Sequence, residues 1–240
     1  MPYSDSDKVR RYAQADPLIL LGGVVLTFIA GFVNTISLKY FHVPVSHMSG
    51  VVSGLSIDMA AHEYNEFINL LYIFIGFFIG TILSGYLVGA RNIKPAREYS
   101  VVLFLEFLAL LVAFFMFKRG INFGLTMVSF ACGLQNAMAS NYLGLIIRTT
   151  HVTGIVTDLG VLIGQSLKHK KIRAWKIFFL SSLLGGFFMG GFVALTSFQH
   201  LRFYALLFPA GLCLISSVSF FLLRVRRRSR IKEALPIRIY

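Results

Sequence analysis

The sequence predicts an all-α membrane protein, a helical bundle made of two related halves. Hydrophobic residues make up 56% of the chain, above the roughly 45–50% typical of soluble globular domains, and the mean hydropathy is +0.73. Several apolar runs each approach or exceed the roughly 20 residues that a membrane-spanning helix needs. These runs cover residues 17–40, 67–90, 99–117, 121–143, 174–197 and 203–223. We expect each of them to cross the bilayer once.

The two halves follow from an internal duplication. The matched pairs are Gly31 with Gly133, Asn34 with Asn136, His47 with His151, Gly50 with Gly154, and Gly76 with Gly186. The matches keep the same order in both halves, and their spacing grows slowly along the chain. Duplications of this kind build transport pathways at the interface between repeats in many membrane proteins.

Two further segments, 43–61 and 149–167, are semi-polar and are harder to place. Each opens with an extended-looking stretch, and we expect each to turn helical after Ser49 or Thr153, which are suitable caps. A helix over 50–61 would be about 18 Å long, little more than half of the bilayer core. We therefore predict that both segments re-enter, which gives two inverted repeats of three spanning helices with one half-helix each. If both segments span instead, the fold has eight crossings in two parallel repeats of four.

The positions of Lys and Arg favour six crossings. Basic residues gather at the ends of the apolar runs, as they do in cytoplasmic loops. With a cytoplasmic N-terminus, the six-crossing arrangement leaves outside only Lys39, Lys118, Arg119 and Arg202. The eight-crossing arrangement leaves more basic residues outside, so six crossings are favoured. With a cytoplasmic N-terminus, an even number of crossings makes both termini cytoplasmic. The predicted organisation is a cytoplasmic N-terminal segment (1–16), repeat 1 (17–117), repeat 2 (118–223) and a basic cytoplasmic tail (224–240).

The net charge of +13 comes mainly from the basic residues of these loops. Nothing resembles a nucleic-acid readout module, so no nucleic-acid partner is expected. Membrane lipids are the expected partners of the basic tail, and the Gly-rich helix faces would also allow a homo-oligomer.

Four motifs lie at the start of each half and in the semi-polar segments. They are Gly31-Phe-Val-Asn34-Thr, Val45-Ser-His-Met-Ser-Gly50, Gly133-Leu-Gln-Asn-Ala137 and Arg148-Thr-Thr-His-Val-Thr-Gly154. Together they resemble the YoaK-like family, a group of small bacterial membrane proteins of unknown function. The resemblance covers roughly residues 20–223 and implies a multi-pass protein of the bacterial inner membrane, without implying an activity. This chain has Asn34 where the family usually has Asp, Ser49 where it has Thr, and Val51 and Ile155 where it has Asn.

The polar residues of these motifs are the candidate substrate-binding residues. They are Asn34, Ser46, His47, Ser49, Gly50, Gln135, Asn136, Thr150, His151, Thr153 and Gly154. If helices begin at Gly50 and Gly154, their free N–H groups and positive dipole ends favour an anion or a carboxylate near the midplane. His47 and His151 would face each other across the pseudo-two-fold axis, and imidazole titrates near physiological pH. Interhelical hydrogen bonding is the alternative role for the polar side chains.

Two acids, Glu106 and Asp158, are predicted to be buried in the membrane, where acids are functional candidates for ion or proton coupling. No metal site is predicted, because the two motif histidines lack carboxylate or thiolate companions at ligand spacing. No cofactor fingerprint or nucleophile–base motif is present, so we do not expect an enzyme.

The function expected from the sequence is a small secondary transporter or channel-like permease. Its solute would be small and anionic or carboxylate-bearing, and it would bind near the midplane between the repeats. A non-catalytic membrane scaffold or sensor is the alternative, and an intramembrane enzyme that uses His47 or His151 comes third.

Overall fold

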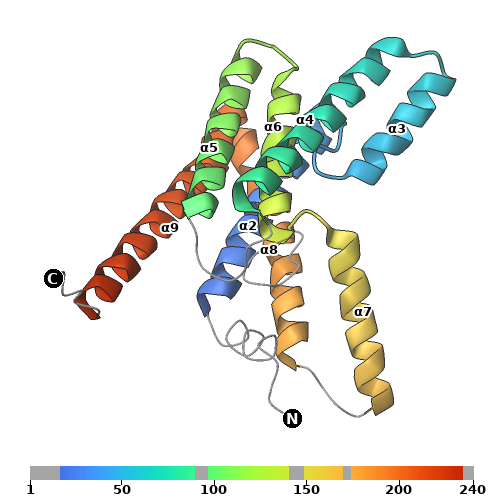
Figure 1. Cartoon of the computed structure of the whole chain (residues 1–240). Helices are drawn as coiled ribbons and strands as arrows, with labels where there is room; N and C mark the ends of the chain where they lie inside the picture. The colour runs from blue at the N-terminus through green and yellow to red at the C-terminus, as the bar shows by residue number, and fades with distance from the viewer. Residues whose placement is uncertain (1–16, 90–96, 141–148, 170–173, 235–240) are drawn as a thin grey trace.

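The computed structural model describes residues 17–89, 97–140, 149–169 and 174–234, and all the regular secondary structure over these residues is helical. The helices are α2 (Pro17–Phe41), α3 (Met48–Ala60), α4 (Tyr64–Val88), α5 (Arg97–Lys118), α6 (Gly124–Ser140), α7 (Val152–His169), α8 (Ala174–Leu201) and α9 (Leu207–Ala234), with a short 3-10 helix, η2 (Arg202–Leu206), before α9. The predicted all-α class is confirmed. In the view of Figure 1, the α3–α4 and α7–α8 pairs diverge from a common centre on one side of the bundle.

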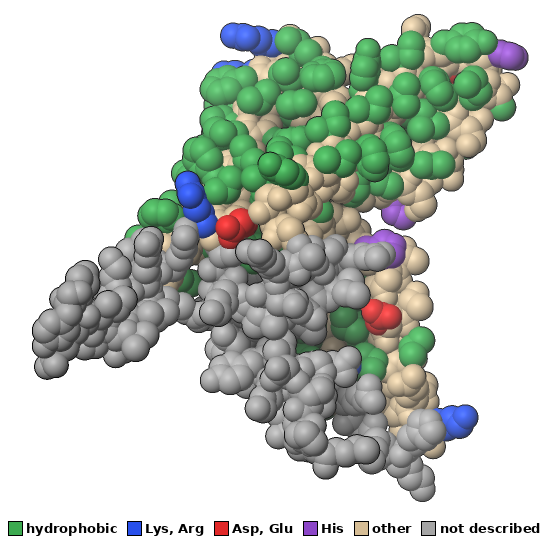
Figure 2. Space-filling model, viewed as in Figure 1, with side chains coloured by type: hydrophobic (Ala, Val, Ile, Leu, Met, Phe, Trp, Pro, Cys, Tyr) green, Lys and Arg blue, Asp and Glu red, His purple; other side chains and the backbone are tan. Residues whose placement is uncertain are grey.

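Several of the helices are long and apolar enough to cross a membrane. Within the described residues, four stretches meet this condition: Leu20–Phe41, Tyr64–Val88, Arg97–Lys118 and Ala174–Leu223, the last of which holds both α8 and the first part of α9. The side chains of Phe78, Tyr86 and Phe188 are 57%, 86% and 69% exposed, and hydrophobic side chains cover much of the described surface in Figure 2. Apolar surface of this extent belongs in lipid rather than in water. The protein is therefore embedded in a membrane.

Local sequence explains where these helices stop. Gly89, with φ 61°, follows the last residue of α4, and its N–H donates to Gly85 O. Gly120, with φ 72°, follows α5, and the N–H of Ile121 reaches back to Met116 O. Both glycines have a positive φ, which glycine adopts with little strain because it has no Cβ atom.

Two helix pairs make the closest contacts of the bundle, and each joins one repeat to the other. The α carbon of Gly31 on α2 lies against Phe187 O on α8, and Gly190 on α8 lies against Phe28 O on α2. The second pair repeats the pattern at duplicated positions: Gly133 on α6 lies against Phe77 O on α4, and Gly80 on α4 lies against Phe130 O on α6. Small residues let helix backbones approach this closely in membranes. Buried glycines at 76, 80, 186 and 190 each lie against the facing helix, so their role is to pack helices together.

The chain between α2 and α3 doubles back into the bundle. His42 takes a left-handed conformation, with φ 57°, directly after α2, and Pro44 prevents the helix from resuming. Residues 42–47 are non-helical, which agrees with the extended stretch expected at the start of the segment 43–61. Of the corresponding stretch of the second half, 145–152, residues 145–148 lie outside the described residues, and 149–151 are also non-helical.

The starts of the two semi-polar helices differ slightly from the prediction. α3 begins at Met48 rather than Gly50, and α7 begins at Val152 rather than Gly154. Ser49 and Thr153 therefore lie inside the first turns and do not cap the helices as predicted. With 13 residues, α3 is about 20 Å long, shorter than a bilayer core of about 30 Å. In Figure 1, both helices begin near the middle of the molecule, and they run toward opposite ends of it.

The C-terminal boundary also differs. α9 continues to Ala234, so the first part of the predicted tail, 224–240, extends the last helix. The predicted N-terminal segment, 1–16, lies outside the described residues.

Candidate functional site

Asn34 and Ser46 join the middle of α2 to the non-helical stretch before α3. The Oδ1 atom of Asn34 accepts the Ser46 hydroxyl at 2.8 Å and the Ser46 N–H at 3.3 Å. Ser46 is buried and Asn34 is half-buried. A backbone N–H at this depth needs a partner because there is no water in the hydrocarbon core. The asparagine supplies one, so this pair holds the non-helical stretch in place.

Gln135 does related work in the second half. Its Nε2 donates to Leu26 O on α2 at 2.6 Å and to the Thr149 hydroxyl at 2.9 Å, and the side chain is fully buried. One amide therefore links α6, α2 and the chain that precedes α7. The neighbouring predicted residues differ in exposure: Thr150 is buried, and Asn136 is half-buried.

Ser129 forms a third link, which the sequence analysis missed. Its Oγ lies 2.9 Å from both Val45 O and Ile73 O and shares its proton between them. Val45 belongs to the non-helical stretch and Ile73 to α4, so Ser129 on α6 joins three segments at a fully buried point. A lone serine in an apolar run carries no sequence signal of such a role.

The motif histidines both lie at helix starts and are exposed. His47 is the N-cap of α3, makes no side-chain capping bond, and has its Nε2 3.1 Å from the Ser49 hydroxyl. A Cβ atom on Gly50 would come within 2.9 Å of His47 Cδ2, and one on Gly154 within 2.7 Å of His151 Nδ1. In each repeat, then, the imidazole folds back over the glycine three residues later. The glycines make room for the rings, a reason for their presence that the sequence analysis did not foresee.

The two predicted coupling acids differ in burial. Glu106 on α5 is 1% exposed, and its Oε2 has no hydrogen-bond partner among the described residues. Its carboxyl group lies beside the thiol of Cys213 on α9. Asp158 on α7 is exposed and is not enclosed by neighbouring helices. Its position on the free side of a helix that packs mainly against α8 explains the difference. In the described part of the chain, no group of three or more His, Cys, Asp or Glu side chains is placed to hold a metal ion.

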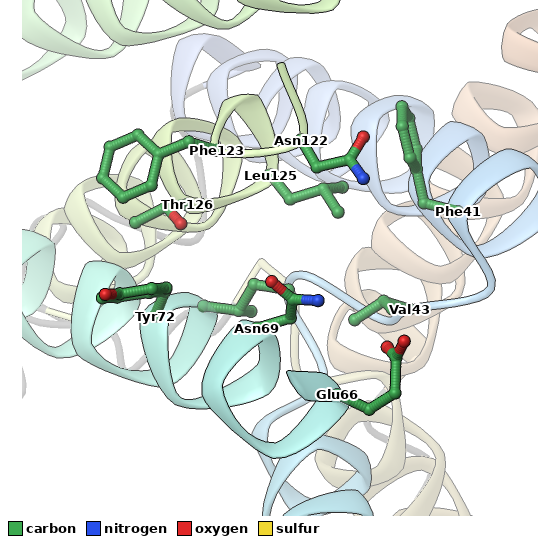
Figure 3. Close-up of a pocket in the computed structure, with 10 residues that line it drawn as sticks. Phe41, Val43, Glu66, Asn69, Tyr72, Asn122, Phe123, Leu125 and Thr126 are labelled. Carbon is green, nitrogen blue, oxygen red and sulfur yellow. The ribbon is translucent and has the colours of Figure 1, made fainter. Parts of the chain in front are cut away.

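A cavity of about 250 Å³ opens at the end of the bundle where α4 and α6 begin (Figure 3). Its lining residues are Phe41, Val43, Glu66, Asn69, Tyr72, Ile73, Asn122, Phe123, Leu125 and Thr126. Glu66, Asn69 and Tyr72 stand on α4, one helical turn apart, and face Phe123, Leu125 and Thr126 of the α6 side across the open space. The three-residue spacing of Glu66, Asn69 and Tyr72 is visible in the sequence and places them on one face of a helix. That this face lines a cavity was not predicted.

None of the predicted substrate-binding residues lines this cavity. The structure brings Asn34 to Ser46 and His47 to Ser49, while Gln135 pairs with Leu26 and Thr149. The cavity borders this region, because Val43 and Ile73 line it and the Ser129 hydroxyl donates to the carbonyl of Ile73.

The fold and the site define an all-helical membrane protein with glycine-packed helix pairs. Residues 22–219 match a protein family that is described as a protein of unknown function, DUF1275. The chain belongs to this family, which is consistent with the YoaK-like resemblance seen in the motifs. The match identifies no enzymatic family. No curated protein and no solved structure matches the chain.

Proposed function

We propose that the protein is a small secondary transporter or channel-like permease of the bacterial inner membrane. The observation that carries the proposal is the pair of non-helical stretches that end mid-molecule, each followed by a helix and each held by buried polar side chains. Irregular backbone at membrane depth is tolerated where it is enclosed by protein or lines a water-filled path. Transporters with broken helices place their solute at such points.

The proposed topology is that of two inverted repeats, with α2 to α5 in the first and α6 to α9 in the second. Three observations support it: the duplicated motifs, the matched glycine contacts, and the opposite directions of α3 and α7 in Figure 1. In this arrangement α3 and α7 re-enter, and both termini are cytoplasmic. The basic residues Lys168 and Lys176 then lie on the same side as the termini, as the positive-inside rule requires.

The solute proposed from the sequence is anionic or carboxylate-bearing and binds where α3 and α7 begin. Support comes from His47, the N-cap residue of α3. Its side chain makes no capping bond, so the first N–H groups of α3 receive no hydrogen bond from it. The first N–H groups of a helix attract negative charge. Of the two proposed coupling groups, Glu106 has the stronger support because it is buried without a full set of hydrogen bonds, which favours exchange of a proton.

Transport into liposomes tests the proposal. Purified protein is reconstituted, and uptake from a mixture of small metabolites is followed by mass spectrometry, with the Gly50→Leu variant measured in parallel. We expect the wild type to move a defined solute and the variant to move none, because the leucine displaces the His47 ring. If the wild type moves nothing that empty liposomes do not, the transport proposal fails.

A membrane scaffold or sensor is the second candidate, and one observation favours it. Asn34, Ser46 and Gln135 are engaged in hydrogen bonds between segments, which is a structural use of polar side chains. A protein that binds a small molecule but moves none would have this function.

A further inference from the structure

We propose that the cavity at the start of α4 and α6 binds the positively charged amine group of a small solute. This inference rests on the proposed function in one respect: it treats the cavity as the outer mouth of the solute path. No residue of the cavity belongs to the sequence-predicted site.

The charge of the lining points to a cation. Glu66 is the one charged side chain among the described residues that line the cavity, and Figure 3 shows it beside Asn69 at the edge of the open space. An acid in the first turn also stabilises α4 through the helix dipole, but that effect does not require the carboxylate to face a cavity. The amides of Asn69 and Asn122 add hydrogen-bonding groups from two different segments.

The walls suit an organic cation better than a bare ion. Tyr72 and Phe123 lie on opposing segments, with their ring centroids 5.9 Å apart in an edge-to-face arrangement, and Phe41 closes a third side. Aromatic faces attract ammonium groups, most strongly where water is scarce. Ile73 and Leu125 supply apolar surface for a short carbon chain.

The volume limits the size of the solute. A cavity of about 250 Å³ holds about eight water molecules at ≈ 30 Å³ each. It would therefore hold a solute of about eight non-hydrogen atoms. Butylammonium, butyrate and γ-aminobutyrate are all within this limit, and they differ in whether they carry the amine, the carboxylate or both.

Equilibrium binding of labelled butylammonium to the full-length protein in lipid nanodiscs tests the proposal. Glu66→Gln keeps the shape of the side chain and removes its charge, and we expect it to weaken binding about tenfold. Glu63→Gln, one turn earlier and outside the lining, is the matched control and should leave the affinity unchanged. Asn69→Phe, at an exposed position, should fill the cavity and abolish binding.

Competition with unlabelled probes identifies the solute class. Butyrate should compete far more weakly than butylammonium. Stronger competition by γ-aminobutyrate supports a zwitterion, whose carboxylate would suit the starts of α3 and α7; weaker competition supports a simple amine. Equal affinities of the Glu66→Gln and Glu63→Gln proteins, equal competition by butyrate, persistent binding to Asn69→Phe, or no binding to the wild type would each overturn the proposal. Binding without any transport would overturn the proposed function and leave this inference standing.

Discussion

The imidazole of His47 covers the α carbon of Gly50, so closely that an added Cβ would lie 2.9 Å from Cδ2 of the ring. His151 and Gly154 have the same relationship at the start of α7, with 2.7 Å to Nδ1. Two copies of one local geometry, at duplicated positions, tie the histidine to the glycine as a unit.

The first prediction concerns this unit. Gly50→Leu and Gly154→Leu should abolish transport, because the new side chain displaces the imidazole from the helix start. Uptake into liposomes at matched protein yield is the measurement. Gly160→Leu is the control, since a Cβ there meets no atom within 4 Å, and it should transport normally. Full transport by both leucine variants at the helix starts would show that the rings have no role in the path.

A second prediction concerns the packing of α4 against α6. Gly80→Leu should lower the free energy of unfolding by about 3 kcal/mol or more, because its side chain would collide with the backbone carbonyl of Phe130. Thermal unfolding in detergent and the yield of folded protein are the measurements. Gly85→Leu on the same helix faces open space and should be tolerated. Equal losses in the two variants would contradict the assigned contact.

Removing the Ser129 hydroxyl is the basis of a third prediction. Ser129→Ala should destabilise the protein by about 1–2 kcal/mol, because the Val45 and Ile73 carbonyls lose a shared donor. Ser56→Ala is the comparison: Ser56 is exposed and bonds only to Val52 O of its own helix, so a change within about 0.5 kcal/mol is expected. The two unfolding temperatures give the result directly. A Ser129→Ala protein as stable as the Ser56→Ala protein would argue against the three-segment link.

Topology gives a fourth prediction. Cysteines placed at Glu63 and Lys168 should react with a membrane-impermeant maleimide from opposite sides, Lys168 from the cytoplasm. The native Cys132 and Cys213 are buried and should remain unlabelled. The eight-crossing arrangement would put both positions in the cytoplasm, so labelling of both from that side would remove the inverted repeat.

Coupling through Glu106 is the fifth prediction. Glu106→Gln should retain solute exchange between two sides at equal concentration but lose uptake driven by a proton gradient, because the amide exchanges no proton. Glu98→Gln, in the first turn of the same helix, is the control and should keep both activities. Gradient-driven uptake by the Glu106→Gln protein would assign the carboxyl a structural role and leave Asp158 as the coupling candidate.

The fold class and the helices could be predicted from the sequence because both depend on local properties. Long apolar runs set the spans, and the turn glycines at 89 and 120 set two helix ends. The starts of α3 and α7 were misplaced by two residues because Ser49 and Thr153 are good caps, yet His47 takes that position in α3.

The contacts within the site depend on which helices meet, and this is beyond a single sequence. Nothing local distinguishes Ser129 from other serines in apolar helices, and Glu66 resembles any acid in a first helical turn. The exposure of Asp158 could not be foreseen either, because it depends on α7 packing mainly against α8.

The glycine contacts have a mechanical consequence. The backbones of α2 and α8 approach closely at their glycines, as do those of α4 and α6. In the proposed topology, each pair takes one helix from each repeat. In that topology the two repeats are interleaved. Neither repeat can then move as a rigid unit without separating α2 from α8 and α4 from α6. Any rocking motion must instead occur between the mixed pairs, which meet at fewer points where α2 approaches α6. In the proposed topology, the repeats and the helix pairs between which rocking would occur are thus different sets of helices.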